Sequence, residues 1–417
     1  MDRRAFFRVA GAAAAVPVLG SALAACGDDK EETAAVDAKA STTTKPKGPL
    51  RKVKLGFIAL TDCASLVMAK ELGYFEQRGL DVTLEKQASW PATRDNLLIG
   101  AIDGAHCLSS MPYSVATKIG GDGSQALKIA MMLNNNGQAI TLNKDFASVG
   151  YGDLAKAKAA LESKSPTLAM TFPGGTHDTW LRYWLKATKA KNLADIKIIP
   201  IPPPQMVANM TAGAMDGYCV GEPWNAVAVA QGIGFTHLTT QDLWQHHPEK
   251  ALVVNESFAT KQPEVLKDLM GAVLEASKWL DEPKNRAKAA EAIGAAQYVN
   301  APAAEIQGRM EGKYELGQNL GTKTYVEDTM RFYRDGLVNA PMKSHGLWFM
   351  AQYQRFGLLK EAPPYQQIVD SIVLSDLYAE VAKAEGIDVP DDMKPFEVRL
   401  DKATFDPTKP DEEAKRP

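Results

Sequence analysis

From residue 53 onward, short apolar runs rich in β-branched residues alternate with helical patterns, and this alternation is the strongest constraint on the fold. Residues 53–60 and 80–86 are typical of buried strands. Residues 65–75 and 91–100, which follow them, are typical of helices. Each strand and helix pair occupies roughly 25 to 30 residues, as expected for βα units. The sequence therefore predicts an α/β fold.

The alternation falls into two sets, and long amphipathic helices follow them. Because the chain leaves the first set near Lys144 and returns near Lys250, we predict a two-lobed clamp. One lobe comprises residues 51–144 and 250–417, and the other comprises residues 145–249. The additional C-terminal helices are expected at 263–280, 286–298, 325–333 and 365–384, against the first lobe. A cleft between lobes is the usual site for a small ligand, although a two-domain enzyme would show the same arrangement.

The N-terminus predicts export. Residues 1–25 contain Arg3 and Arg4 before two phenylalanines, then an Ala- and Val-rich stretch, and resemble a twin-arginine signal. The signal ends in Leu-Ala-Ala before Cys26, which resembles a bacterial lipobox, so we expect lipidation of Cys26 and anchoring on the extracytoplasmic face of the membrane. The alternatives are cleavage without lipidation and export by the general secretory route. Residues 26–50 lack aromatic residues and are rich in charge, Thr, Ala and Pro, which predicts a flexible tether.

Composition excludes several classes of function. The 417 residues carry 47 Lys and Arg against 50 Asp and Glu, a net charge of −3, so no basic field exists for nucleic acid. The predicted signal holds three arginines and one aspartate, which leaves −5 on the remainder, so any anion must be held by local groups. After Cys26, three scattered cysteines remain: Cys63, Cys107 and Cys219. They predict buried thiols, or one disulfide with a leftover thiol, and no zinc or iron–sulfur site.

The chain lacks the common catalytic motifs. There is no GxSxG, GxxxxGK[ST], GxGxxG or HExxH, and the six histidines have no metal-ligand spacing. We therefore expect no enzyme activity, no cofactor and no metal.

One segment indicates an anion site. Residues 171–178, Thr-Phe-Pro-Gly-Gly-Thr-His-Asp, lie between a predicted strand and a predicted helix. Backbone N–H groups at Gly174, Gly175 and Thr176 and the start of the helix could face an anion, and His177 could add a side-chain donor. The alternative is a tight turn that serves only the backbone, with His177 on the surface.

Five further residues lie where they could line the cleft. Trp90 follows the second predicted strand and could form a wall, or could simply pack in the core. Gln138 lies in a polar turn and could donate to an oxyanion, or serve only that turn. Gly221 and Glu222 occupy another strand-to-helix turn. Lys250 lies at the return crossing, where a solvated hinge lysine is the alternative.

Several long motifs, in order, resemble the nitrate-binding lipoproteins of bacterial ABC importers, a branch of the periplasmic binding proteins. They include VKLGFIALTDCASLVMAKELGYFEQRGLDVTL, LNNNGQAITL, FPGGTHDTWLRYWLKA, GYCVGEPWNAVAVAQGIGFTHLTT and LWQHHPEKAL. The resemblance runs from about residue 52 through the C-terminal helices. It implies a bilobal type II periplasmic-binding-protein clamp that binds nitrate, or nitrite, and delivers it as a monomer to a permease and an ATPase. The binding residues that it implies are Trp90, Gln138, His177, Gly221 and Lys250. We expect Gly174, Gly175, Thr176 and Glu222 to lie behind them as supporting residues.

The resemblance also supplies the alternatives. In bicarbonate-binding relatives an acidic residue replaces the lysine and helps hold a metal ion, and the histidine is not kept. The presence of His177 and Lys250 therefore favours nitrate over bicarbonate, because an ammonium attracts a monovalent anion directly. Cyanate or sulfonate transport, a cytoplasmic nitrate sensor, and an enzyme of the related pyrimidine-synthesis branch are further alternatives. The signal argues against the sensor, and the lack of a cysteine-rich segment argues against the enzyme.

Overall fold

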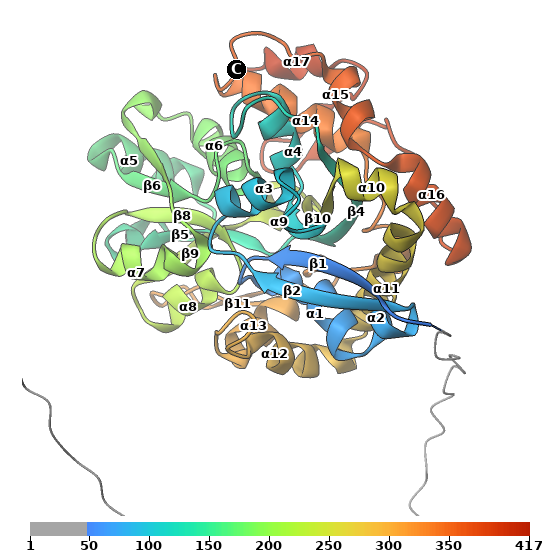
Figure 1. Cartoon of the computed structure of the whole chain (residues 1–417). Coiled ribbons are helices and arrows are strands. Elements are labelled where there is room, and N and C mark those ends of the chain that lie inside the picture. The colour runs from blue at the N-terminus through green and yellow to red at the C-terminus, as the bar shows by residue number, and fades with distance from the viewer. Residues whose placement is uncertain (1–47) are drawn as a thin grey trace, which may run out of the picture. The chain divides into compact units, whose positions relative to one another are not determined.

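Two five-stranded sheets form the framework of residues 48–417, the part of the chain that this computed structural model describes (Figure 1). The predicted signal, Cys26 and nearly all of the predicted tether lie outside the described residues. The first sheet has the order β2 (Leu80–Lys86), β1 (Arg51–Phe57), β3 (Gly104–Leu108), β10 (Pro248–Asn255), β4 (Leu127–Asn135). The second has the order β7 (Lys197–Pro200), β6 (Thr167–Met170), β8 (Gly217–Gly221), β5 (Gln138–Asn143), β9 (Gly234–Thr239).

Each sheet combines parallel strands with one antiparallel insertion. In the first sheet β1 pairs in parallel with β2 and β3, and β10 lies antiparallel between β3 and β4. In the second sheet β6 pairs in parallel with β7 and β8, and β5 lies antiparallel between β8 and β9. The inserted strands β5 and β10 are the ones that directly follow the two crossovers between the sheets. Each sheet with its helices is called a lobe below, and the two-lobed α/β prediction is confirmed.

The first crossover is very short. Only Asn136 and Gly137 separate β4 from β5. Gly137 has a φ of 93°, and a Cβ there would collide with the side chain of Met330, so this turn requires glycine. The lobe boundary expected at residue 144 needs correction, because β5 pairs with β8 and β9 and so belongs to the second lobe. The return crossover runs through α9 (Thr240–Leu243) to β10.

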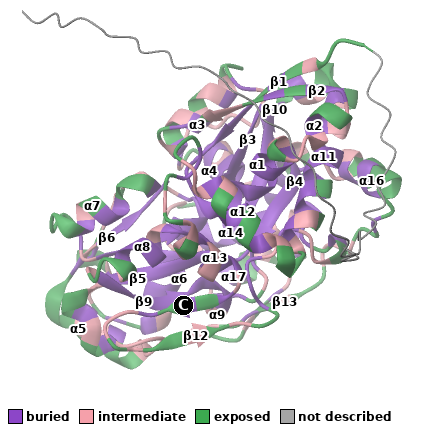
Figure 2. Ribbon diagram, turned by 90° about the horizontal axis from the view of Figure 1, so that it is seen from below, coloured by how far each residue is buried: buried purple, intermediate pink, exposed green. Residues whose placement is uncertain are grey.

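Helices cover both sheets, and the strands between them are largely buried (Figure 2). The first lobe carries α1 (Ala64–Glu71), α2 (Tyr74–Gln77), α3 (Trp90–Leu98), α4 (Met111–Ala116) and α10 (Glu256–Lys261). The second lobe carries α5 (Leu154–Lys164), α6 (Thr176–Thr188), α7 (Met206–Thr211) and α8 (Trp224–Ala230). One apolar cluster packs α1 against the first sheet, and another continues from the first lobe into the second. The lobes therefore share part of one core.

The C-terminal region is more varied than the predicted run of helices. It contains α11 (Pro263–Asp281), α12 (Arg286–Gly294), α13 (Ala303–Met310), α14 (Lys343–Arg355), α15 (Tyr365–Ile372), α16 (Ser375–Ala384) and α17 (Pro410–Ala414), with two hairpins, β11–β12 (Lys313–Glu315, Thr322–Thr324) and β13–β14 (Phe396–Val398, Ala403–Phe405). The helix predicted at 325–333 is absent from this segment. The helix predicted at 365–384 is divided into α15 and α16.

The assignment of residues 250–417 to the first lobe also needs correction. Helices α11 and α12 do pack on α1 of the first lobe. The N–H of Thr236, in β9 of the second lobe, however, donates to the carbonyl of Leu316 over 2.8 Å, and Leu400 N–H donates to Leu243 O over 2.9 Å. Helix α14 contacts both α4 and α6. The C-terminal segments thus contact both lobes, because their apolar faces pack across the junction between them.

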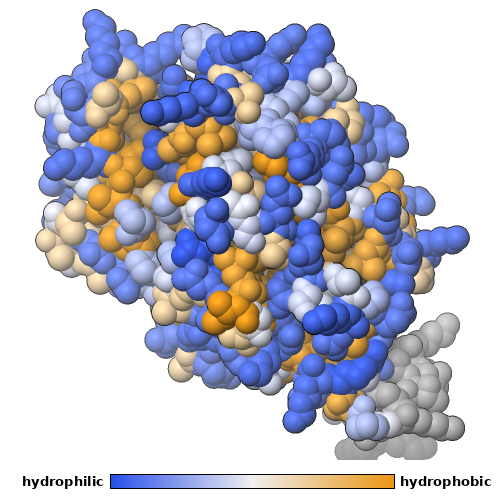
Figure 3. Space-filling view, turned by 45° about the horizontal axis from the view of Figure 1, so that its top comes forward, coloured by the Kyte–Doolittle hydropathy of each residue, from blue (hydrophilic) through white to orange (hydrophobic). Residues whose placement is uncertain are grey.

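The exposed surface and the three described cysteines complete the fold. Hydrophilic side chains interrupt the apolar ones on the face in Figure 3. No described helix combines the length and the apolar character needed to cross a membrane. Cys63, Cys107 and Cys219 are buried free thiols, so the structure contains no disulfide among them.

Candidate functional site

The binding residues predicted from the sequence come from both lobes and face the junction between them. Trp90 begins α3, Gln138 begins β5, His177 lies in the first turn of α6, Gly221 ends β8, and Lys250 lies in β10. The four side chains are fully buried. A small set of buried charged groups surrounds Lys250 and reaches His177.

Hydrogen bonds between the lobes close this region. Thr61 N–H, after β1, donates to the carbonyl of Glu222, after β8, over 2.7 Å. Trp224 Nε1 donates to the carbonyl of Ala59 over 2.9 Å. These bonds join the first lobe to the second directly beside Gly221. The structure is therefore a closed form of the clamp.

Lys250 lies at the centre of the charged groups. Its ammonium donates to Asp62 Oδ2 and to Glu249 Oε1, each over 2.7 Å, and lies 5.8 Å from the ring centre of Trp90. Burial would lower the pKa of Lys250, but the two carboxylates outweigh this and hold its pKa above the ordinary value. Lys250 therefore stays charged. Since an ammonium has three N–H donors, one is left for a ligand.

Glu249 connects the two lobes through this cluster. It lies in β10 of the first lobe, and its carboxylate accepts from Thr176 Oγ1 over 2.6 Å and from Trp180 Nε1 over 3.1 Å, both in α6 of the second. Burial would raise the pKa of Glu249, but the charge of Lys250 and the hydrogen bond of His177 hold it well below its ordinary value. Glu249 is thus an ionised, well-satisfied acceptor.

Asp62 is the second acidic partner of Lys250. It lies in a short 3-10 turn (Thr61–Cys63) after β1, and its Oδ1 is 2.6 Å from His106 Nε2 in β3. Burial would raise the pKa of Asp62, but Lys250 and His106 together lower it. Burial lowers the pKa of His106 despite the adjacent carboxylate. Asp62 is therefore ionised, and a neutral His106 donates to it from Nε2.

His177 has one satisfied and one unsatisfied ring nitrogen. Nδ1 lies 2.6 Å from Thr171 Oγ1. Nε2 lies 3.4 Å from Glu249 Oε1 and has no hydrogen-bond partner among the described residues. Burial lowers the pKa of His177 below its ordinary value, so the imidazole is neutral. The nearby carboxylate favours the tautomer with the proton on Nε2.

Three nitrogens in this cluster retain hydrogen-bonding capacity. They are Lys250 Nζ, His177 Nε2 and Trp90 Nε1, and the last is buried without a partner among the described residues. An unpaired buried donor is costly, so this set indicates a ligand that accepts hydrogen bonds from several sides. A small oxyanion has that chemistry.

Gln138 and Gly221 lie opposite each other in the β5–β8 ladder. Gln138 Nε2 donates to the carbonyl of Asn136 over 3.2 Å, which uses one of its two N–H groups. A Cβ at Gly221 would lie 3.3 Å from Asp62 Oδ2. The missing side chain at Gly221 therefore lets the backbone of the second lobe approach the charged cluster closely.

Gly174, Gly175, Thr176 and Glu222 were expected to support the binding residues, and their contacts differ from that prediction. The N–H of Gly174 donates to Asp178 Oδ2, and the N–H of Gly175 donates to Phe172 O, each over 2.9 Å. These two backbone groups serve the turn, so the predicted anion seat at the glycines needs correction. Thr176 does reach the cluster, through Glu249. The carboxylate of Glu222 turns away and lies 3.4 Å from Arg309 Nε.

Three residues of the cluster, Asp62, His106 and Glu249, were not singled out by sequence reasoning. Asp62 and Glu249 are charged residues at the ends of otherwise apolar strand segments, and this contrast is a signal that could have identified them. His106 lies within the apolar run Gly104–Leu108 and gives the same signal more weakly.

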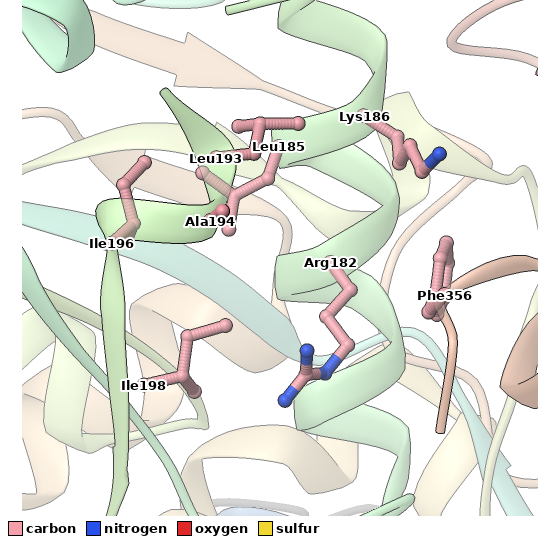
Figure 4. A pocket seen from close by; sticks show the side chains of 8 residues that line it. All are labelled: Arg182, Leu185, Lys186, Leu193, Ala194, Ile196, Ile198 and Phe356. Atoms are coloured by element: carbon pink, nitrogen blue, oxygen red, sulfur yellow. The ribbon is translucent and has the colours of Figure 1, made fainter. Parts of the chain in front are cut away.

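A large surface hollow lies elsewhere in the second lobe (Figure 4). It has a volume of about 400 Å³ and is lined by Arg182, Leu185, Lys186, Leu193, Ala194, Ile196, Ile198 and Phe356. It contains none of the predicted site residues. Within residues 48–417, no three His, Cys, Asp or Glu side chains are arranged to hold a metal ion.

Two α/β lobes joined by two crossovers, with a buried polar cluster between them, are the architecture of the periplasmic-binding-protein fold. The crystal structure of the periplasmic nitrate-binding protein NrtA from Synechocystis PCC 6803 is similar, with a TM-score of 0.83 and 38% identity over 88% of this chain and 98% of that one. Residues 46–294 match the profile of the NMT1-like family, and the chain belongs to this family.

Two curated relatives extend the comparison. The chain is 38% identical over 434 residues to the nitrate/nitrite binding protein NrtA of Nostoc sp. This alignment covers 99% of this chain and 97% of the relative. It is 35% identical over 336 residues to the nitrate import ATP-binding protein NrtC of Synechocystis sp. That alignment covers 80% of this chain and 50% of the relative. The family resemblance seen in the sequence motifs is thereby confirmed.

Proposed function

We propose that this chain is an extracytoplasmic solute-binding protein that captures nitrate, or nitrite, between its lobes and delivers it to an ABC importer. Lipid on Cys26 would anchor it to the membrane, and it would act as a monomer without catalysing a reaction. The similarity to nitrate/nitrite binding proteins over nearly the whole chain supports the cargo. The match to half of a nitrate import ATP-binding protein supports the partner.

The observation that carries the proposal is the set of buried donors. Nitrate is planar, accepts hydrogen bonds through three oxygens and donates none. Lys250, Trp90 and His177 each offer a buried N–H donor that the described residues do not use fully. We propose that these three, with Gln138 and Gly221 from the second lobe, surround the anion.

The size of nitrate bounds its affinity. It has four heavy atoms, and a ceiling of about 1.5 kcal/mol per atom gives a binding free energy of roughly 6 kcal/mol, which corresponds to a Kd of tens of micromolar. Tighter binding requires charge-assisted hydrogen bonds in a dry site. Lys250 is the group that supplies them, because its charge is retained at full burial.

The proposed mechanism is capture and delivery. An anion held by donors from both lobes binds the closed form better than the open form, so it shifts the population toward closure. Glu249 already connects β10 to α6 in the closed form. The closed shape is then what the permease recognises.

The test is a calorimetric titration of the purified chain with nitrate. Replacing Lys250 by Met removes the charge while keeping an unbranched side chain, and we expect affinity to fall at least 100-fold. Lys128→Met is the matched control, since Lys128 is also a buried lysine of the first sheet but donates to Ser371 instead. Nitrate binding by Lys250→Met with unchanged affinity would refute the site.

A milder variant guards against misfolding of Lys250→Met. Trp90→Phe keeps the aromatic ring and deletes one neutral donor, so a loss of about tenfold is expected. Titrations with bicarbonate, with and without calcium, address the main rival cargo. Binding of bicarbonate in preference to nitrate would overturn the proposed cargo while leaving the transport role.

A further inference from the structure

The cluster between the lobes contains more negative than positive charge. The carboxylates of Asp62 and Glu249 share the single ammonium of Lys250, each at 2.7 Å. The imidazoles of His106 and His177 are neutral, because burial lowers the pKa of each. The cluster therefore carries one net negative charge before any anion arrives. A second negative charge in this dry site, unaccompanied, would be strongly opposed.

His177 is the group in this cluster whose proton-accepting ring nitrogen, Nδ1, already faces a hydrogen-bond partner. Its Nδ1 lies 2.6 Å from Thr171 Oγ1, and a hydroxyl can donate to a bare nitrogen or accept from a protonated one. Its Nε2 faces Glu249 Oε1 at 3.4 Å. His106, by contrast, has an Nδ1 without a hydrogen-bond partner among the described residues, so a proton added there would be unpaired.

The groups around His177 also favour this residue as the one that accepts a proton. The charged groups that act on His177 are Glu249 and Lys250 of β10 and Asp62 after β1, and Asp178 is its neighbour in α6. Cys219 of β8 and His247 after α9 lie close to the same Glu249 and Lys250. Burial raises the pKa of the Cys219 thiol and lowers that of the His247 imidazole, so both are neutral. The ionised Glu249 is the group nearest to Nε2 and favours a positive charge on His177.

We propose that His177 takes up one proton when the anion binds, so that the protein captures nitrate and a proton as a pair. This inference rests on the proposed function and deepens it. The imidazolium donates from Nδ1 to Thr171 and from Nε2 toward the anion and Glu249. The net charge of the cluster then stays at one negative after binding instead of rising to two.

The test is calorimetry of the full chain with nitrate at pH 8 in two buffers of different ionisation enthalpy, Hepes and Tris. The dependence of the observed heat on buffer enthalpy gives the number of protons taken up, and close to one per nitrate is expected. The Kd is expected to rise about tenfold per pH unit above neutrality. His177→Gln should abolish the proton uptake, and the matched variant His237→Gln, at a buried histidine of β9 outside the cluster, should retain it.

A second pair of variants keeps the imidazole. Thr171→Val removes the partner of Nδ1 and is expected to reduce both proton uptake and affinity at pH 8, whereas Thr171→Ser should preserve both. Nitrate binding by the unmodified chain without proton uptake would overturn this inference and leave the proposed function standing. Full uptake in His177→Gln or Thr171→Val would also overturn it. Absence of any nitrate binding by the unmodified chain would overturn the proposed function and the inference together.

Discussion

Glu249 and Lys250 are neighbours in β10, yet both side chains contribute to one cluster. In a regular strand successive side chains point to opposite faces of the sheet. Here the pairing of β10 with β4 is irregular on both sides of Lys250, as in a β-bulge. A bulge redirects side chains locally, and it allows Glu249 Oε1 to lie 2.7 Å from Lys250 Nζ. A local irregularity of the backbone thus accompanies the meeting of these two opposite charges in the candidate site.

A buried histidine away from the cluster makes a prediction about acid stability. His237, in β9, has Nδ1 2.8 Å from the carbonyl of Gly150 and accepts from Trp184 Nε1 over 3.1 Å. Both contacts fit the neutral ring, and burial lowers the pKa of His237 to about 4. An unfolded histidine has a pKa of about 6.5, so the unfolded state binds the proton first as pH falls.

The contribution of His237 to the free energy of unfolding should therefore be complete above pH 6.5 and should decline as the pH falls toward 4. His237 alone accounts for a loss on the order of 3 kcal/mol across that window. Urea unfolding at pH 7.5, 6 and 5 measures it, with His237→Gln as the comparison. If that variant has the same pH dependence as the unmodified chain, His237 is not the source.

The sequence predicted part of the candidate site and could not predict the rest. Lys250, His177 and Trp90 were found because they lie at turns and crossovers next to apolar strands, and the structure links them through Glu249 and Asp62. Glu249 was missed because strand alternation places neighbouring side chains on opposite faces, whereas here Glu249 Oε1 lies 2.7 Å from Lys250 Nζ. The role expected for the glycine N–H groups was wrong, since Asp178, four residues after Gly174, binds one of them.

At the scale of elements, a buried ion pair joins α13 to the turn between β8 and α8. Arg309 lies 3.4 Å from Glu222 and also donates to the carbonyl of Glu315, with its guanidinium 4.5 Å from the ring centre of Tyr314. Burial raises the pKa of Glu222 above its ordinary value, against the attraction of Arg309. The pair therefore connects the C-terminal region to the second lobe at an energetic cost.

Removing one partner of this ion pair should lower the free energy of unfolding strongly. We expect Arg309→Met to lower the free energy of unfolding by about 3 to 5 kcal/mol, because it leaves the buried Glu222 without its cation. The double variant with Glu222→Gln should recover a substantial part of that loss. Urea unfolding of both single variants and the double variant completes the cycle. Simple additivity of the two single effects would contradict the interaction.

The strands and most helices follow from periodicity, whereas the segment at 325–333 does not. Its apolar spacing indicates a helix, but Asp281 accepts hydrogen bonds from three consecutive backbone N–H groups, those of Phe332, Tyr333 and Arg334. Arg331 also forms a bridge with Asn135 of β4. These tertiary hydrogen bonds replace those of a helix. The local sequence pattern could not predict them, because Asp281 lies about 50 residues earlier in the chain.

At the scale of the whole molecule, C-terminal segments cover both crossovers between the lobes. Asn136, in the first crossover, donates to Asp328 Oδ1 over 2.8 Å. Trp244, in the return crossover, stacks on Phe396 with ring centres 4.5 Å apart and an angle of 8°. Any opening of the lobes must bend backbone that these contacts restrain.

The proposed closure predicts a change in overall dimensions. Because the cluster is fully buried in the closed form, a ligand can enter only if the lobes separate in solution. Small-angle X-ray scattering should therefore show a smaller radius of gyration with saturating nitrate than without it. Lys250→Met should show no such change, since it is expected not to bind. An identical radius in both conditions would contradict closure as the signal to the permease.

The stacking of Phe396 on Trp244 has a consequence for how such a protein can diversify. Apparent affinity is the intrinsic affinity reduced by the fraction of molecules in the competent form. Residues that hold the crossovers set that fraction, and the residues around Lys250 set which anion is preferred. Substitutions in the β13–β14 hairpin are therefore expected to shift the anion concentration at which the protein is half-saturated, while its choice of anion stays the same.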